Sequence, residues 1–225
     1  MRARDNPLTV QRLQALRYRL DDVSRAALLV RFAEHGHRGA IVGPEGHGKT
    51  TLLRDLDACF TESGWELRSV RLRRGQGGFT VEERHSLRAR LDRHVLLSVD
   101  GVDELSPLNR FRLKRWARDA GGLLVAAHRE GYLPTVWRCR TSPELLATLL
   151  DELGLAGSVS GEQARALHAA HRGNLREVFS ALYDLYAGLP DPPASGAAAK
   201  LGVSAAAAGS PSRSRSSSDR RSAPC

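Results

Sequence analysis

The sequence predicts an α/β fold in which a parallel five-stranded sheet carries helices on both faces and is followed by a small C-terminal helical lid. Three observations lead to this prediction. Short apolar runs alternate with amphipathic helical patterns between residues 37 and 140. A Gly-rich turn joins the first apolar run to the helix behind it, and the pattern from 141 to 187 is helical alone. Strands that alternate with helices form parallel sheets covered on both faces.

The elements expected along the chain follow from apolar spacing and from helix-start residues. Strands are expected at residues 39–42, 65–72, 95–99, 123–127 and 135–139. Helices are expected at residues 8–20, 22–34, 49–60, 80–92, 107–120, 142–153, 161–171 and 174–187. The helix from residue 80 begins with a capping box, because Thr80 is followed three residues later by Glu83.

Four parts are expected in the chain. They are an N-terminal helical segment at 1–36, an α/β core at 37–140, a helical lid at 141–187 and a tail at 188–225. The tail is rich in Ala, Ser, Pro and Arg and has no apolar periodicity, so it cannot bury enough apolar surface to offset the entropy of ordering. We therefore expect the tail to be disordered.

Composition excludes several classes of protein. No apolar run approaches the ~18 residues of a membrane-spanning helix. The Arg-rich start lacks the apolar centre of a secretory signal. The three cysteines, Cys59, Cys139 and Cys225, lie far apart, which fits neither a disulfide framework nor a Cys-rich zinc site. We expect a cytoplasmic protein without a membrane partner.

The net charge of +9 leaves nucleic acid open as a partner. Only three of the 34 basic residues are lysine, and genome composition explains such an arginine bias as well as function does. Aromatic residues make up 5% of the chain, too few for a base-stacking platform.

A phosphate-loop motif lies between the first expected strand and the helix that follows it. Its residues are Gly43, Pro44, Glu45, Gly46, His47, Gly48, Lys49 and Thr50, which match the Walker A pattern GxxxxGK[ST]. Glycines let backbone N–H groups turn inward around a phosphate, and the helix N-terminus adds partial positive charge. Lys49 would bridge the β- and γ-phosphates, Thr50 would bind Mg²⁺, and Thr51 can reach the α-phosphate. We expect His47 to face solvent or the γ-phosphate.

A second motif stands at the end of the apolar strand at 95–99. Asp100 follows this strand where a Walker B aspartate holds the water shell of Mg²⁺. Glu104 or Asp103 would orient and polarise the attacking water. The two motifs together predict that the chain binds a nucleoside triphosphate with Mg²⁺ and hydrolyses it. ATP is favoured over GTP because the chain has no Asn-Lys-x-Asp run.

The order of these motifs resembles the P-loop ATPases of the AAA+ and STAND groups, in which an extra strand lies between the two Walker strands. The run from Asp100 to Glu104 is similar to the NACHT-type Walker B, where a small residue follows the magnesium aspartate. AAA+ proteins proper have Glu where Gly101 stands, so the catalytic base stays open between Glu104 and Asp103. The resemblance covers residues 36–187 and implies a nucleotide-driven switch or loader with a protein partner.

The resemblance also implies two sensor positions. In these groups a polar residue ends the strand after Walker B and contacts the γ-phosphate, and here it is His128 or Arg129. The run Gly173-Asn-Leu-Arg-Glu resembles the start of an AAA+ lid helix, whose arginine, here Arg176, reaches over the γ-phosphate. Only residues 129–134 separate the sensor strand from the next apolar run, so the usual arginine-finger position is missing. No hexameric ring is implied, and the oligomeric state stays open.

Two alternatives to an ATPase stay open. A small-molecule P-loop kinase would share the phosphate loop but transfer phosphate to an acceptor instead of water. A non-hydrolysing module would bind ATP to sense it, or would recruit nucleic acid, without turnover.

Overall fold

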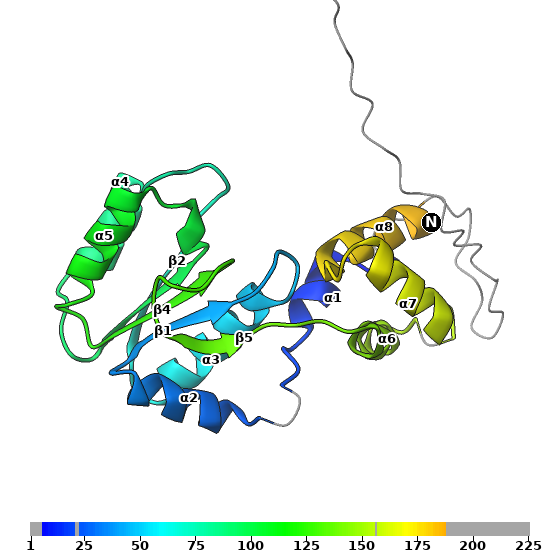
Figure 1. Cartoon of the computed structure of the whole chain (residues 1–225), viewed down its shortest axis with the longest axis horizontal. Coiled ribbons are helices and arrows are strands. Elements are labelled where there is room, and N and C mark those ends of the chain that lie inside the picture. Colours follow the sequence, from blue (N-terminus) through cyan, green and yellow to red (C-terminus); the bar gives the residue numbers. More distant parts are fainter. Residues whose placement is uncertain (1–5, 21–22, 156, 188–225) are drawn as a thin grey trace, which may run out of the picture.

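The fold was analysed in a computed structural model, which describes residues 6–20, 23–155 and 157–187. Figure 1 shows a sheet with helices against it and a separate group of helices beside it. All strand pairs are parallel, and the strands lie in the spatial order β2-β3-β4-β1-β5. The predicted α/β fold with a parallel five-stranded sheet is confirmed. The expected disorder of the tail concerns residues 188–225, which lie outside the described residues.

The bounds of the elements are as follows. The strands are β1 (Arg38–Val42), β2 (Glu66–Arg71), β3 (Val95–Asp100), β4 (Gly122–Ala127) and β5 (Thr135–Arg138). The helices of the sheet region are α2 (Arg25–Glu34), α3 (Lys49–Glu62), α4 (Val81–Arg88) and α5 (Pro107–Trp116), with a 3-10 turn η2 (Val102–Glu104). The remaining helices are α1 (Val10–Ala15), α6 (Pro143–Glu152), α7 (Gly161–Ala170) and α8 (Leu175–Ala187).

The sheet is buried on both faces by two apolar clusters. On one face, Ile41, Leu96 and Leu124 pack against α2 and α3. On the other face, Leu97 and Val125 belong to the cluster of α4 and α5. Successive strand residues therefore alternate between two cores, which explains why the strands read as continuous apolar runs.

The lid is a helical group with its own apolar core. Leucines of α6 and α7 pack with Val178 and Phe179 of α8. The same cluster includes Leu8 and takes in Leu13 of α1, and Figure 1 shows α1 among the lid helices. The N-terminal segment is thus divided, because α1 packs with the lid whereas α2 contacts β1 and β5.

Three helices end earlier than the sequence predicts. The helix expected at 8–20 covers only α1, and the backbone turns extended at Leu16. Beyond this point the N–H of Tyr18 donates to the buried carboxylate of Asp55 in α3 at 2.8 Å, so residues 16–20 run across α3 instead of continuing a helix. The helix α4 stops before an extended Ala89, and α5 stops at Trp116, short of the expected residues 92 and 120. In the described residues, no helix is both long and apolar enough to cross a bilayer.

A carboxyl group between α3 and the sheet couples stability to pH. Burial raises the pKa of Asp57 to about 6, while hydrogen bonds from the hydroxyls of Ser98 and Ser69 act in the opposite direction. Because this pKa lies above the ordinary value of 3.8, the folded state binds more protons than the unfolded chain between the two pH values. Asp57 therefore makes the protein less stable as the pH rises from about 4 to about 6.

We expect the Asp57→Asn variant to lose this contribution. The difference in free energy of unfolding between the variant and wild type should shift in favour of the variant by about 2 to 3 kcal/mol from pH 4 to pH 7. Denaturant titration at each pH measures this difference. The exposed Asp151→Asn change is the control and should leave the pH profile as in wild type. Parallel profiles for wild type and Asp57→Asn would contradict this assignment.

Candidate functional site

The phosphate loop at residues 43–50 runs from the end of β1 to the start of α3. Gly46 and Gly48 have φ angles of +74° and +84°, which residues with a Cβ rarely adopt. Gly48 is the N-cap of α3, so the unpaired N–H groups of the first helical turn face the loop. The predicted strand–loop–helix context is present, and it can turn backbone amides toward an anion.

The ammonium group of Lys49 is held inside this loop. The residue is 9% exposed, and its Nζ donates to the carbonyl oxygen of Pro44 at 2.7 Å. Burial lowers the pKa of Lys49, and nearby acidic groups, Cys139 and Asp100 among them, oppose this shift. A shielded ammonium that has a neutral carbonyl as its hydrogen-bond partner would be stabilised by an anionic ligand.

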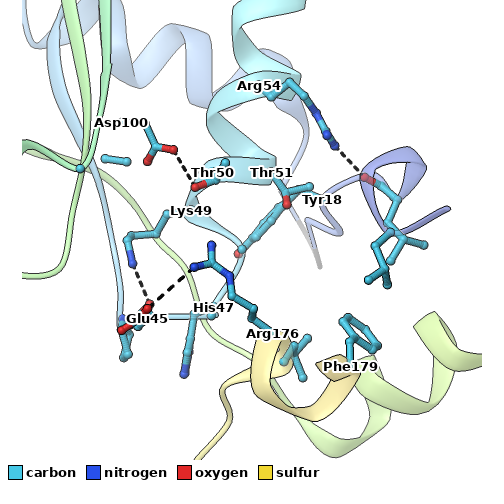
Figure 2. A pocket seen from close by; sticks show the side chains of 18 of the residues that line it. Tyr18, Glu45, His47, Lys49, Thr50, Thr51, Arg54, Asp100, Arg176 and Phe179 are labelled. Atoms are coloured by element: carbon cyan, nitrogen blue, oxygen red, sulfur yellow. Dashed lines mark hydrogen bonds and ion pairs between the residues drawn. The ribbon is translucent and has the colours of Figure 1, made fainter. Parts of the chain in front are cut away.

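Thr50 and Asp100 connect the two predicted motifs directly. The hydroxyl of Thr50 donates to Oδ2 of Asp100 at 2.8 Å, and Figure 2 shows this contact beside Lys49. Strand β4 lies between β1 and β3, so the extra strand expected between the Walker strands is present. Arg71, at the end of β2, is paired in register with Asp100, and its Nε lies 2.9 Å from the same Oδ2.

The two candidate bases, Asp103 and Glu104, lie in η2 directly after β3. One oxygen of Asp103 accepts the backbone N–H of His128 and lies 3.5 Å from Nδ1 of the same residue. Glu104 is held differently, because its Oε2 accepts the backbone N–H of Gly75 at 2.8 Å. Asp103 is thus engaged by the end of β4, while Glu104 is held by the loop after β2.

The predicted sensor residues also reach this region. His128 and Arg129 follow β4, are exposed, and line the same cavity as Lys49 and Asp100. Arg176 projects from the first turn of α8, and its Nη1 lies 3.8 Å from Oε1 of Glu45 in the phosphate loop (Figure 2).

The phosphate loop and the lid touch at Gly46. A Cβ on Gly46 would lie 1.7 Å from Oδ1 of Asn174, far inside van der Waals contact. The Asn174 side chain is fixed at the start of α8, since its Oδ1 accepts the N–H of Glu177 at 3.3 Å and its Nδ2 donates to the carboxylate of Glu177 at 2.8 Å. The absence of a side chain at Gly46 therefore sets how closely the lid approaches the loop.

Of the two surroundings expected for His47, the structure does not show solvent, and a contact with a γ-phosphate stays a prediction. Both ring nitrogens are buried. The ring lies against Gly173 of the lid, where an added Cβ would come within 3.2 Å of it. Burial lowers the pKa of His47, an interaction with the backbone of Arg172 acts to raise it, and the charge of Lys49 acts in the same direction as burial. His47 packs the loop against the lid and does not point to solvent.

A cavity of about 1940 Å³ unites these residues between the sheet edge and the lid. All the predicted site residues except Gly43 line it, which are Pro44, Glu45, Gly46, His47, Gly48, Lys49, Thr50, Thr51, Asp100, Asp103, Glu104, His128, Arg129 and Arg176. Altogether its wall holds nine arginines and one lysine against four acidic residues, counting those just named. The excess of positive charge suits a polyphosphate.

The opposite end of the cavity is apolar. At this end the wall includes Leu8 of the N-terminal segment, Leu149 of α6 and Phe179 of α8, which belong to one apolar cluster. Tyr18 lies nearer the loop, with its ring 2.9 Å from the position of a Cβ on Gly48 (Figure 2). A ligand that carries a flat apolar group on a polyphosphate could bind with its phosphates at the basic end of this cavity and its apolar group at the apolar end.

Sequence reasoning missed Arg71 and Tyr18. Arg71 lies one residue before the end of the strand expected at 65–72, but its position beside Asp100 depends on β2 being the neighbour of β3, which the sequence leaves open. Tyr18 was expected within a helix, and it reaches the loop because the chain runs extended across α3. A basic residue at the end of a strand was the available signal for Arg71.

Comparisons with known proteins give a likeness in fold. No protein-family model matches the chain, and no curated protein matches it. Among solved structures, one variant of RuvB from Thermotoga maritima is 18% identical, with a TM-score of 0.44, over 71% of this chain and 57% of that one. A second RuvB variant is 16% identical, with a TM-score of 0.46, over 72% of this chain and 61% of that one. The chain thus spans less than two thirds of both proteins, and we draw no conclusion about activity from them.

The contact of Gly46 with the lid leads to a stability prediction. Gly46→Ala adds both a strained positive φ and a clash with Asn174, so we expect the first turn of α8 to lose protection from hydrogen exchange and the melting temperature to fall. Gly64→Ala is a matched control, because Gly64 has a φ of +86° but nothing within 4 Å of an added Cβ. Equal effects of the two changes would mean that backbone strain alone matters and that the lid contact does not.

Proposed function

We propose that the chain is an AAA+-like ATPase that binds ATP with Mg²⁺ in this cavity and hydrolyses it. The observation that carries the proposal is the hydrogen bond between Thr50 and Asp100 beside the buried ammonium of Lys49. These three groups are the ones a Walker A loop and a Walker B strand use to hold a metal-bound triphosphate. The NACHT-like Asp100-Gly101 sequence supports a place near the STAND group.

The residues present fit a magnesium ion. Thr50 and Asp100 offer hard oxygen ligands on one side of the cavity. In the described residues, no group of three or more His, Cys, Asp or Glu side chains could hold a metal by itself. This suits Mg²⁺, which commonly takes one or two protein ligands and fills its shell with water and phosphate oxygens. The bound ion would neutralise charge on the phosphates.

Glu104 is the proposed base and Asp103 its positioning neighbour. Among the residues that the structure describes, no hydrogen bond engages the second oxygen of Glu104, so it is available to accept a proton from the attacking water as the bond to the γ-phosphorus forms. Asp103 is committed to His128 and so fixes the end of β4. Lys49 and the loop amides would hold the charge on the phosphate oxygens while the bond to the leaving ADP breaks.

The lid supplies the nucleotide-dependent switch in this proposal. Arg176 is paired with Glu45 at 3.8 Å, and both side chains are largely exposed, so this ion pair is weak. A γ-phosphate would compete with Glu45 for Arg176 and draw α8 toward the loop. The adenine would lie against the apolar end of the cavity, where the N-terminal segment meets the lid.

Two substitutions separate binding from turnover. Lys49→Ala should lower the affinity for MgATP at least ~100-fold, because it removes the buried ammonium. Glu104→Gln should keep the affinity and lower the rate of phosphate release ~100-fold or more, because the amide cannot accept the proton. Affinity is measured with a fluorescent ATP analogue, and turnover by release of inorganic phosphate.

Asp103→Asn is the matched control for the base. If this variant stops turnover while Glu104→Gln remains active, the roles of the two acids are reversed. If phosphate passes to an added small molecule in place of water, the protein is a kinase. Tight binding without any turnover in wild type would favour an ATP-sensing module.

A further inference from the structure

A groove outside the nucleotide cavity gathers four arginines. Arg88 and Arg90 enter it from the end of α4, and Arg115 and Arg118 from the end of α5. The groove has a volume of about 570 Å³, and Leu91, Trp116 and Asp119 complete its wall. It opens just before β3 and β4 begin, so it lies at the sheet edge opposite the phosphate loop.

The four guanidinium groups have no anionic partner within residues 6–20, 23–155 and 157–187. Among the described residues, none of them forms a hydrogen bond or an ion pair, although Arg88 stacks on the ring of Trp116 at 5.5 Å. Most other arginines on α4, α5 and the strands are occupied, as Arg68 is by Glu66 and Arg110 by the carbonyl of Asp103. Four like charges around one groove repel one another, and Asp119 offers a single negative charge against them.

We propose that this groove binds the sugar–phosphate backbone of a single-stranded nucleic acid. Guanidinium groups donate paired hydrogen bonds to phosphate oxygens, and four of them can engage successive phosphates of one strand. The net charge of +9 would attract such a polyanion over a longer range. With Trp116 already covered by Arg88, the groove has no free aromatic face for a base, so recognition would not depend on sequence.

An acidic protein segment fits the groove less well. Protein interfaces draw their affinity from a desolvated apolar centre, but the apolar part of this groove is Leu91 and Trp116, both already packed against the core. The exposed apolar side chains of α5, Leu108 and Phe111, lie at the other end of the helix and do not line the groove. A phosphate backbone binds through charge and does not need an apolar surface in the groove.

The test uses the full chain and a fluorescein-labelled 20-mer of deoxythymidine, followed by anisotropy at several salt concentrations. Wild type should bind with a log–log salt slope of about −3, as expected for about four phosphates of a single strand. Arg115→Glu should weaken binding about tenfold or more at low salt and bring the slope closer to zero by about one unit. Arg118→Glu should do the same.

Arg165→Glu is the matched control, because Arg165 is also an exposed helical arginine and the change in net charge is identical. Arg165→Glu should retain binding of the oligonucleotide. Lys49→Ala should retain it as well, and this result would show that the groove binds the oligonucleotide independently of the nucleotide cavity and of the proposed ATPase activity. Equal loss in Arg115→Glu and Arg165→Glu would mean a general charge effect and would overturn the proposal. Binding that is unchanged in Arg115→Glu and Arg118→Glu would overturn it too.

Two further probes distinguish other partners. Poly-glutamate of similar charge should compete weakly, and competition as strong as that of the oligonucleotide would favour an acidic protein partner and overturn the proposal. A 20-base-pair duplex should bind less tightly than the single strand, because the stiff duplex cannot bend its phosphates around one groove. Tighter binding of the duplex would contradict the single-strand assignment.

Discussion

The hydrogen bond between the Thr50 hydroxyl and the Asp100 carboxylate is the contact on which the geometry of the site depends. It joins the loop after β1 to the end of β3 across β4, which is possible because all the parallel strands end at one edge of the sheet. The apolar clusters on both faces hold the register, with Leu97 opposite Leu123. A slip of one residue would turn Asp100 to the other face of the sheet. Packing of the core therefore sets the distance between the two motifs.

Local chemistry explains which features the sequence could predict. The strands, the capping box at Thr80 and the Gly-rich loop each depend on residues that are neighbours in the chain, and the structure has all of them. Arg71, Tyr18 and the burial of His47 depend on contacts between distant segments. Periodicity cannot tell which strand lies beside β3, nor that a lid glycine will cover an imidazole. The roles of the individual site residues remain predictions.

The N-terminal segment shows how one buried charge can override helix propensity. Asp55 is 2% exposed and accepts the backbone N–H of Tyr18, and Arg17 pairs with it at 3.1 Å. A helix through residue 20 would use that N–H internally and take one hydrogen bond away from a buried carboxylate, which costs free energy even though Arg25 also pairs with it. The chain runs extended across α3 and brings α1 to the lid. The apolar end of the cavity exists because of this crossing.

The arginine groove and the candidate base stand at the two ends of one helix. The helix α5 spans about 15 Å from the turn that holds Glu104 to Trp116 in the groove. At its start, Arg110 donates to the carbonyl of Asp103, and Asn109 donates to the carbonyl of Gly77 in the loop whose Gly75 holds Glu104. A strand that pulls on the end of α5 would thereby move both acids. If binding of the strand changes the affinity for MgATP, linkage requires that MgATP change the affinity for the strand by the same factor. Equal oligonucleotide affinities with and without MgATP would mean that the two sites act independently.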